Sequence, residues 1–63
     1  MTLKEASEQG IDVCIYYNHE DDSWKWDLNG GYSSCGARNG YKTPNEALEE
    51  LNRFMETFNG FNK

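Results

Sequence analysis

The spacing of apolar residues changes once along this chain, from every second residue in the first half to every third or fourth in the second. Between residues 11 and 28, hydrophobic and polar residues alternate, which is typical of strands with one buried face. From residue 43 onward they recur at the i, i+3, i+4, i+7 spacing of an amphipathic helix. Because 63 residues have room for one core only, the strands and the helix must share it in a single domain, residues 1–63.

Two strands joined by a polar turn are predicted for the alternating region. Each places its large apolar side chains on one face: Ile11, Val13, Ile15 and Tyr17 in the first, then Trp24, Trp26 and Leu28 in the second. The polar run at residues 18–23 has the composition of a hairpin turn. Asn29-Gly30 predicts a second turn, of type I′, because both central residues of that turn need a positive φ. A third strand is then expected over residues 31–37.

The helix has the clearest boundary signals in the chain. Thr43 followed by Glu46 forms a capping box, and Pro44 occupies the first helical position, where its missing N–H costs nothing. Gly60 supplies a left-handed stop after the last turn. The apolar stripe of this helix consists of Ala47, Leu48, Leu51, Phe54, Met55 and Phe58.

This stripe needs an apolar partner, and the apolar faces of the first two strands are the only ones available. The predicted fold is therefore α+β: a three-stranded antiparallel β-meander with one C-terminal amphipathic helix packed on one face (βββα). Glu49 and Arg53 are spaced for an i, i+4 ion pair, and Phe61 is expected to fold back onto Met55. Burying about ten side chains at ~2 kcal/mol each is near the minimum for a stable domain, which leaves room for a homodimer.

Residues 1–10 leave two alternatives open, a short helical turn between Thr2 and Gly10 or a frayed end. They contain no apolar run, so no signal peptide is predicted, and no stretch approaches the ~18 apolar residues of a membrane span. A cytoplasmic location with reduced thiols is the default expectation. A disulfide between Cys14 and Cys35 stays open in case their strands are neighbours.

Acidic residues outnumber basic ones, eleven Asp and Glu against six Lys and Arg, for a net charge of −5. Nucleic-acid binding by counterion release needs clustered bases, so this balance disfavours a nucleic-acid partner and favours a basic protein. Two contact surfaces are predicted, the acidic face of the helix and the outward face of the sheet. The candidate contact residues are Glu46, Glu49 and Glu50 on the helix, with Tyr16 and Lys25 on the sheet.

No group of residues carries a catalytic or metal-binding signature, so neither enzyme activity nor a metal or cofactor is predicted. The run His-Glu-Asp-Asp at residues 19–22 lacks the alternating ligands and the fixed glycine of a calcium loop. His19 is the only histidine that could activate Cys14 or Cys35 as a nucleophile. We interpret the run as a solvated hairpin tip and the cysteines as inert thiols.

The strand run at residues 11–17, the acidic turn after it and the segment Gly-Tyr-Lys-Thr-Pro-Asn-Glu-Ala-Leu at 40–48 resemble the N-terminal domain of HicB-like antitoxins. This resemblance implies a βββα core and inhibition of a toxin by contact. Residues 24–30 (Trp-Lys-Trp-Asp-Leu-Asn-Gly) are similar to small YegP-like bacterial domains, which implies only the same order of elements. Both resemblances imply a bacterial or phage origin.

The sequence therefore predicts a small non-enzymatic bacterial or phage protein that binds or regulates another protein by contact. The alternative is an acidic mimic of nucleic acid that inhibits a DNA- or RNA-processing enzyme and whose binding weakens steeply with salt. A third hypothesis is direct binding of single-stranded nucleic acid by stacking on Trp24, Trp26 and Tyr41.

Overall fold

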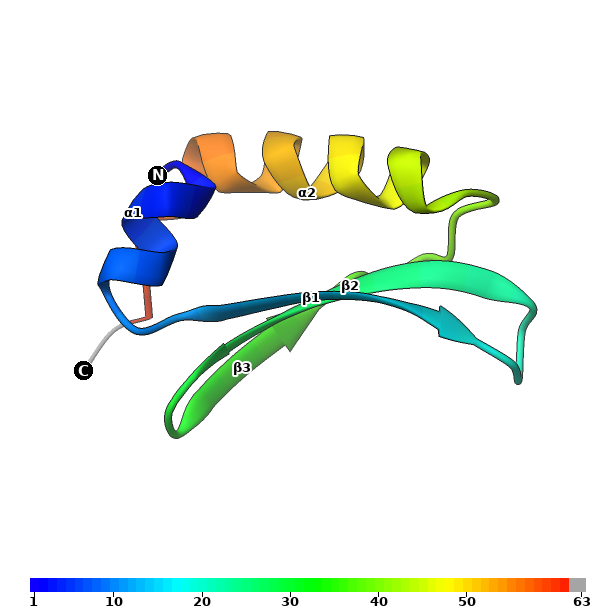
Figure 1. Cartoon of the computed structure of the whole chain (residues 1–63), viewed down its shortest axis with the longest axis horizontal. Helices are drawn as coiled ribbons and strands as arrows, with labels where there is room; N and C mark the ends of the chain where they lie inside the picture. Colours follow the sequence, from blue (N-terminus) through cyan, green and yellow to red (C-terminus); the bar gives the residue numbers. More distant parts are fainter. Residues whose placement is uncertain (62–63) are drawn as a thin grey trace.

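A three-stranded antiparallel sheet with one long helix across a single face forms the body of the protein (Figure 1). The structure is a computed structural model and describes residues 1–61. Its elements are α1 (Leu3–Glu8), β1 (Asp12–Asn18), β2 (Ser23–Gly30), β3 (Ser33–Gly36) and α2 (Pro44–Thr57). The strand order is β1-β2-β3, so the predicted α+β meander with a C-terminal helix on one face is confirmed.

Of the two alternatives for the N-terminal segment, the structure has the helical one. The Thr2 hydroxyl accepts a hydrogen bond from the Glu5 N–H, and the Glu5 carboxylate accepts one from the Thr2 N–H at 2.8 Å, which completes a capping box. Gly10 follows α1 with a φ of +79°, which glycine adopts without strain. Because Ala6 is fully buried against the core, packing holds this short helix in place.

The turn between β2 and β3 lies later than the Asn29-Gly30 pair, so the predicted position of this turn is wrong. Gly30 still pairs with Ser33 in the ladder, and the two-residue loop begins at Gly31, whose φ is +75°. Gly30 has a different role, because a Cβ at this position would come within 2.5 Å of the Phe61 ring. The third strand is correspondingly shorter than predicted.

The core lies between α2 and the middle of the sheet. It consists of Ala6, Ile11, Trp26, Leu28, Ala47, Leu51 and Met55. The indole of Trp26 packs against the Phe54 ring with the ring centroids 4.9 Å apart. Val13 and Tyr17 on β1 are 38% and 37% exposed, and Leu48 on α2 is 37% exposed. The prediction that the helix stripe and the apolar face of β1 cover each other is therefore wrong at Val13 and Leu48, because β1 forms one edge of the sheet.

The end of α2 differs in part from the predicted cap. The helix ends before Phe58, whose backbone is extended, although Gly60 does have the positive φ that the sequence indicated, +100°. The amino group of Met1 donates to the carbonyls of Met55 and Phe58, at 2.6 and 2.8 Å, and so satisfies two groups that a helix end leaves free. Phe61 packs edge-on against Phe58, with centroids 5.2 Å apart, and lies against the core cluster that includes Met55, as its predicted return toward the helix requires.

The two cysteines lie on opposite faces of the sheet and on strands that are not neighbours. Cys35 is opposite Leu28 and shares its core-facing side, whereas Cys14 is opposite Asp27 on the outward side. Both thiols are free, so the alternative of a disulfide between them is excluded. Burial, and secondarily the charge of Asp27, raises the pKa of the Cys35 thiol.

Candidate functional site

Two of the three carboxylates predicted for partner binding on α2 are engaged within the protein. The N-cap hydroxyl of Thr43 accepts from the Glu46 N–H at 3.1 Å, and the Glu46 carboxylate accepts from the Lys42 N–H at 3.1 Å, one residue earlier than a capping box predicts. Arg53 pairs with Glu50 at 3.2 Å and not with Glu49, so the predicted ion pair is wrong in its acidic partner. The acidic face of α2 therefore consists partly of cap and ion-pair groups.

Tyr16 and Lys25, the two candidates on the sheet, lie side by side in the β1–β2 register, on the face opposite to α2. The Lys25 ammonium forms an ion pair with Asp21 at 2.9 Å, which raises the pKa of the lysine. The Asp21 carboxylate accepts from the Ser23 hydroxyl at 2.6 Å, and this bond and then Lys25 lower its pKa. The five predicted contact residues thus lie on two sides of the protein and do not form one site.

The hairpin tip carries no metal-binding geometry within residues 1–61, where no three His, Cys, Asp or Glu side chains converge. The His19 ring instead packs edge-on against Tyr17, with centroids 4.9 Å apart.

Trp26 is 5% exposed beneath α2, so it is not accessible to a stacking base as the third hypothesis requires. Neither helix of the described part is long and apolar enough to span a membrane.

The backbone of β1 presents hydrogen-bonding groups along its outer side that have no partner within residues 1–61. The Ala37 N–H donates to the Trp26 carbonyl at 2.9 Å, so Trp26 directs its backbone groups away from β1. This direction alternates along a strand, so Lys25 and Asp27, the neighbours of Trp26, direct their backbone groups toward β1. Their register partners there are Tyr16 and Cys14. The outward N–H and C=O groups are those of Val13, Ile15 and Tyr17.

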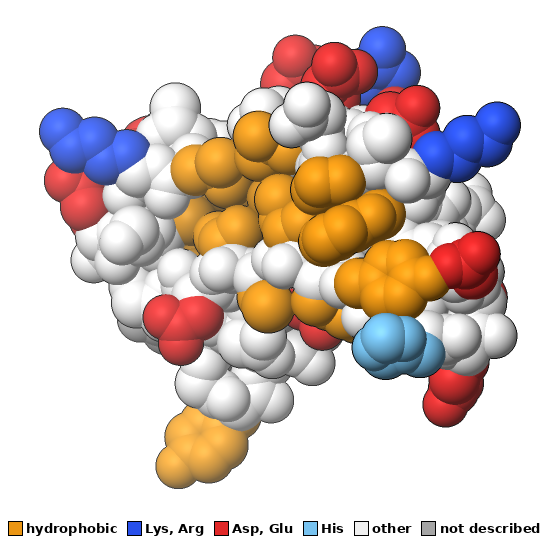
Figure 2. All heavy atoms as spheres, turned by 45° about the vertical axis from the view of Figure 1, so that its right-hand side comes forward, with side chains coloured by type: hydrophobic (Ala, Val, Ile, Leu, Met, Phe, Trp, Pro, Cys, Tyr) orange, Lys and Arg blue, Asp and Glu red, His pale blue; other side chains and the backbone are white. Residues whose placement is uncertain are grey.

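The side chains beside this outer edge are apolar and partly exposed. We call the outer edge of β1 with its flanking apolar side chains the edge surface, which consists of Val13, Ile15, Tyr17 and Leu48. Figure 2 shows an apolar patch on this side of the molecule, with most charged side chains around its margin. The edge has no proline, no lysine and no bulge, which are the features that natural proteins use to protect exposed edges.

On the flank of α2 above the edge surface, Leu48 lies between two uncharged polar residues. The opposite flank of α2 faces β3. Its residues Glu50, Arg53 and Phe54 line a hollow together with the end of that strand. Leu48 therefore faces the β1 side, and the residues one turn before and after it on the same flank are Asn45 and Asn52. Glu49 follows Leu48 directly, and Glu56 lies one turn after Asn52, so carboxylates occupy the solvent side of this flank.

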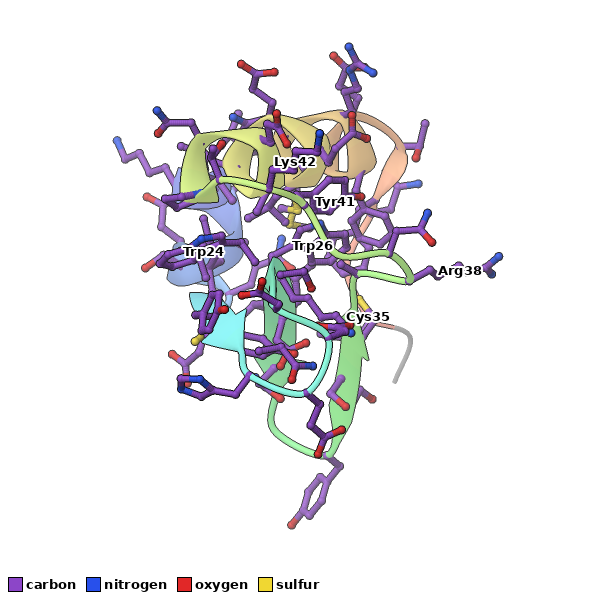
Figure 3. All side chains as sticks on the ribbon, turned by 90° about the vertical axis from the view of Figure 1, so that its right-hand side faces the viewer. Trp24, Trp26, Cys35, Arg38, Tyr41 and Lys42 are labelled. Atoms are coloured by element: carbon purple, nitrogen blue, oxygen red, sulfur yellow. The ribbon has the colours of Figure 1, made fainter. Side chains whose placement is uncertain are left out.

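The hollow on the β3 side has a volume of about 370 Å³ and contains both polar and aromatic groups. Its lining is Trp26, Gly36, Arg38, Asn39, Tyr41, Glu50, Arg53 and Phe54. Figure 3 shows Trp26 and Tyr41 between the sheet and α2, whereas Arg38 extends away from the protein. The indole N–H of Trp26 is buried and has no acceptor within residues 1–61. With Glu50 already paired to Arg53, this hollow offers no convergent set of groups for a reaction.

A second hollow, of about 520 Å³, lies where the β2–β3 turn meets the C-terminal segment. Its lining is Gln9, Ile11, Gly30, Gly31, Tyr32, Ser33 and Phe61. None of these side chains is a charged or nucleophilic group other than the Ser33 hydroxyl and the Tyr32 phenol, so it too carries no catalytic set.

Comparison of the chain with protein-family models, with curated proteins and with solved structures found no match. The resemblances to HicB-like antitoxins and YegP-like domains therefore stay predictions. The edge surface was missed by the sequence reasoning, although a signal for it exists: a meander places its first strand at an edge, and this strand lacks protective residues.

Proposed function

We propose that this protein is a non-enzymatic binding module that acts by protein–protein contact through the edge surface. The observation that supports the proposal is a seven-residue edge strand with outward backbone groups and exposed apolar neighbours. A polypeptide that adds to such an edge gains affinity from backbone hydrogen bonds and specificity from alternate side chains. Aromatic residues such as Tyr17 are also enriched in protein interfaces.

The proposal shifts the predicted contact away from the acidic face of α2. Glu46 and Glu50 are already engaged by the Lys42 N–H and by Arg53, so they are less suited to mimic the phosphates of nucleic acid. The edge surface combines backbone and apolar groups, which are the usual basis of a stable contact. A regulatory role as an inhibitor, which the resemblance to HicB-like antitoxins implies, remains compatible with contact at this edge.

A photo-crosslinking phenylalanine analogue in place of Tyr17 tests the proposal in cells that produce the protein. Tyr17 lies on the edge surface, and Tyr32 at the β2–β3 turn is a matched control because its side chain is fully exposed elsewhere. We expect irradiation to yield a discrete protein adduct from position 17 and none from position 32. Absence of an adduct at position 17, or the same adducts from both positions, would contradict the proposal.

A further inference from the structure

We infer that the occupant of the edge surface is a second copy of this chain, paired β1 to β1 in antiparallel orientation; this inference rests on the proposed function. Two three-stranded sheets would then become one six-stranded sheet. A two-fold axis perpendicular to the sheet relates the copies, so both α2 helices lie on the same face. The apolar faces of the two β1 strands become continuous beneath them.

The alternation of the strand restricts the register of this pairing. Opposite residues in an antiparallel pair lie on the same face, so core-facing residues must oppose core-facing residues. Among these registers, one pairs all seven residues of β1, with Ile15 opposite itself and Val13 opposite Tyr17 of the second copy. The residues with outward backbone groups are then the hydrogen-bonded pairs, because Val13, Ile15 and Tyr17 each contribute one donor and one acceptor.

Charge is compatible with this pairing despite the net charge of −5 on each chain. Asp12 is the only charged residue of β1, and the full-length register places it opposite Asn18 of the second copy. The two Asp12 carboxylates lie at opposite ends of the pairing, ~20 Å apart and beyond the screening length at physiological salt. The helix flank nearest the second copy presents Leu48 with Asn45 and Asn52, whereas Glu49 and Glu56 lie further toward the solvent side of α2.

The core of a single chain is small, so burial of further apolar surface in a dimer favours association. Of the residues that the structure describes, seven are buried, and none of the four edge-surface residues is among them. Antiparallel pairing covers the apolar side chains of both copies and satisfies the outward backbone groups of β1, which have no partner within residues 1–61. The contact follows a strand ~24 Å long, which is modest for an interface, so we expect reversible association that depends on protein concentration.

Sedimentation equilibrium of the purified chain tests for the second copy. We expect the mass to rise with concentration from 7.3 kDa toward twice that value. Val13→Lys places a charge at the exposed edge and should keep the chain monomeric at every concentration, with circular dichroism confirming its fold. Tyr32→Lys, at a fully exposed site on the other hairpin, is the matched control and should associate like the unmodified chain.

Disulfide trapping tests the register. Cys14 is opposite Tyr16 of the second copy as a non-hydrogen-bonded pair, whose Cα atoms lie ~4.5 Å apart, within the range that a disulfide spans. In a Cys35→Ser background, Tyr16→Cys should therefore form a covalent dimer when diamide oxidises the thiols, with loss of two protons and reduction of diamide. The same background with Tyr16 retained should cross-link much more slowly.

A chain that stays at 7.3 kDa at all concentrations overturns the inference, as does a Tyr16→Cys chain that cross-links no faster than its control. These failures differ from a failure of the proposed function. A monomeric chain whose position 17 cross-links to another protein in cells would refute the second copy and retain the function. A monomeric chain without any adduct at position 17 would refute both.

Discussion

The two edges of the sheet differ in length, in side chains and in protection. β3 has four small residues, and beyond its end Tyr41 continues the pairing with Trp24 through two backbone hydrogen bonds of 2.7 and 2.8 Å. β1 has seven residues with large apolar side chains, and its outer edge has no partner within residues 1–61. Short edges and covered edges are common ways to prevent unwanted pairing. The protein has a short edge at β3, covers β2 beyond it with Tyr41, and leaves the longer β1 open, which is why we assign contact to β1.

The largest effect is expected from the core that supports both edges. Leu51→Ala removes a fully buried side chain between α2 and the sheet and should lower the free energy of unfolding by about 2–5 kcal/mol. Leu48→Ala deletes the same atoms at the edge surface and should cost less than about 1 kcal/mol while weakening self-association. Urea denaturation of the two variants measures the difference. Equal losses would show that Leu48 belongs to the core.

The next effect concerns Gly40 and Tyr41, the segment that lies along β2 beyond the end of β3. Gly40 lies against the side chain of Ser23, so a Cβ at position 40 would overlap the Ser23 hydroxyl and Cβ. We expect Gly40→Ala to cost about 1–3 kcal/mol of stability, measured by thermal or urea unfolding. Ser23→Gly in the same chain removes the overlapping atoms and should restore part of the loss. If Gly40→Ala were as stable as the unmodified chain, the packing of Gly40 against Ser23 would not contribute to stability on the β3 side of β2.

The alkylation rates of the two thiols give a chemical comparison of the two edge strands. Cys14 on β1 is exposed, whereas Cys35 on β3 is half-buried and burial raises the pKa of its thiol. Because the thiolate is the reactive species, we expect iodoacetamide to alkylate Cys35 several-fold more slowly than Cys14. Mass spectrometry of the chain, with Cys35→Ser as the assignment control, follows the two reactions. Faster modification of Cys35 would contradict the burial of the β3 side.

The smallest effect is the pH dependence of the hairpin that joins β1 to β2. The pKa of Asp21 is lowered by Ser23 and then by Lys25, so its contribution to stability is present above the ordinary carboxyl pKa and is lost as pH falls through the lowered value. The pKa of Lys25 is raised, so its contribution is lost as alkaline pH rises through that raised value. Asp21→Asn should flatten the acid limb of stability against pH.

Asp22→Asn is the control for this hairpin, because the Asp22 side chain makes no hydrogen bond or ion pair within residues 1–61 and asparagine tolerates its positive φ of 53°. Thermal unfolding across acid pH should therefore separate the two variants. An unchanged acid limb in Asp21→Asn would show that the ion pair at the hairpin tip contributes nothing measurable.

Most of the fold could be predicted because local rules act on adjacent residues. The N-cap at Thr43, the alternation in the first two strands and the helical stripe each depend on spacing alone. The second turn was misplaced because Gly30 and Gly31 are consecutive glycines, and it is Gly31 that has the positive φ while Gly30 pairs with Ser33 in the ladder. The exposure of Val13 was also inaccessible, because it depends on where α2 crosses the sheet.

The candidate site was predicted less well for a related reason. Charges are visible in a sequence, so Glu46 and Glu50 were selected, but their bonds to the Lys42 N–H and to Arg53 appear only in three dimensions. An unpaired backbone edge leaves no single residue type as a signal. It becomes visible only when strand order, register and side-chain exposure are combined.

Amide hydrogen exchange at Ile15 and Ser34 tests the central claim most directly, because both N–H groups point away from the sheet, one at each edge. We expect the Ile15 amide to slow about tenfold or more as protein concentration rises, and the Ser34 amide to exchange rapidly throughout. Cys14, whose amide bonds to β2, should be protected at every concentration. Rapid exchange of Ile15 at all concentrations, or equal slowing of Ile15 and Ser34, would contradict the assignment of self-association to the β1 edge.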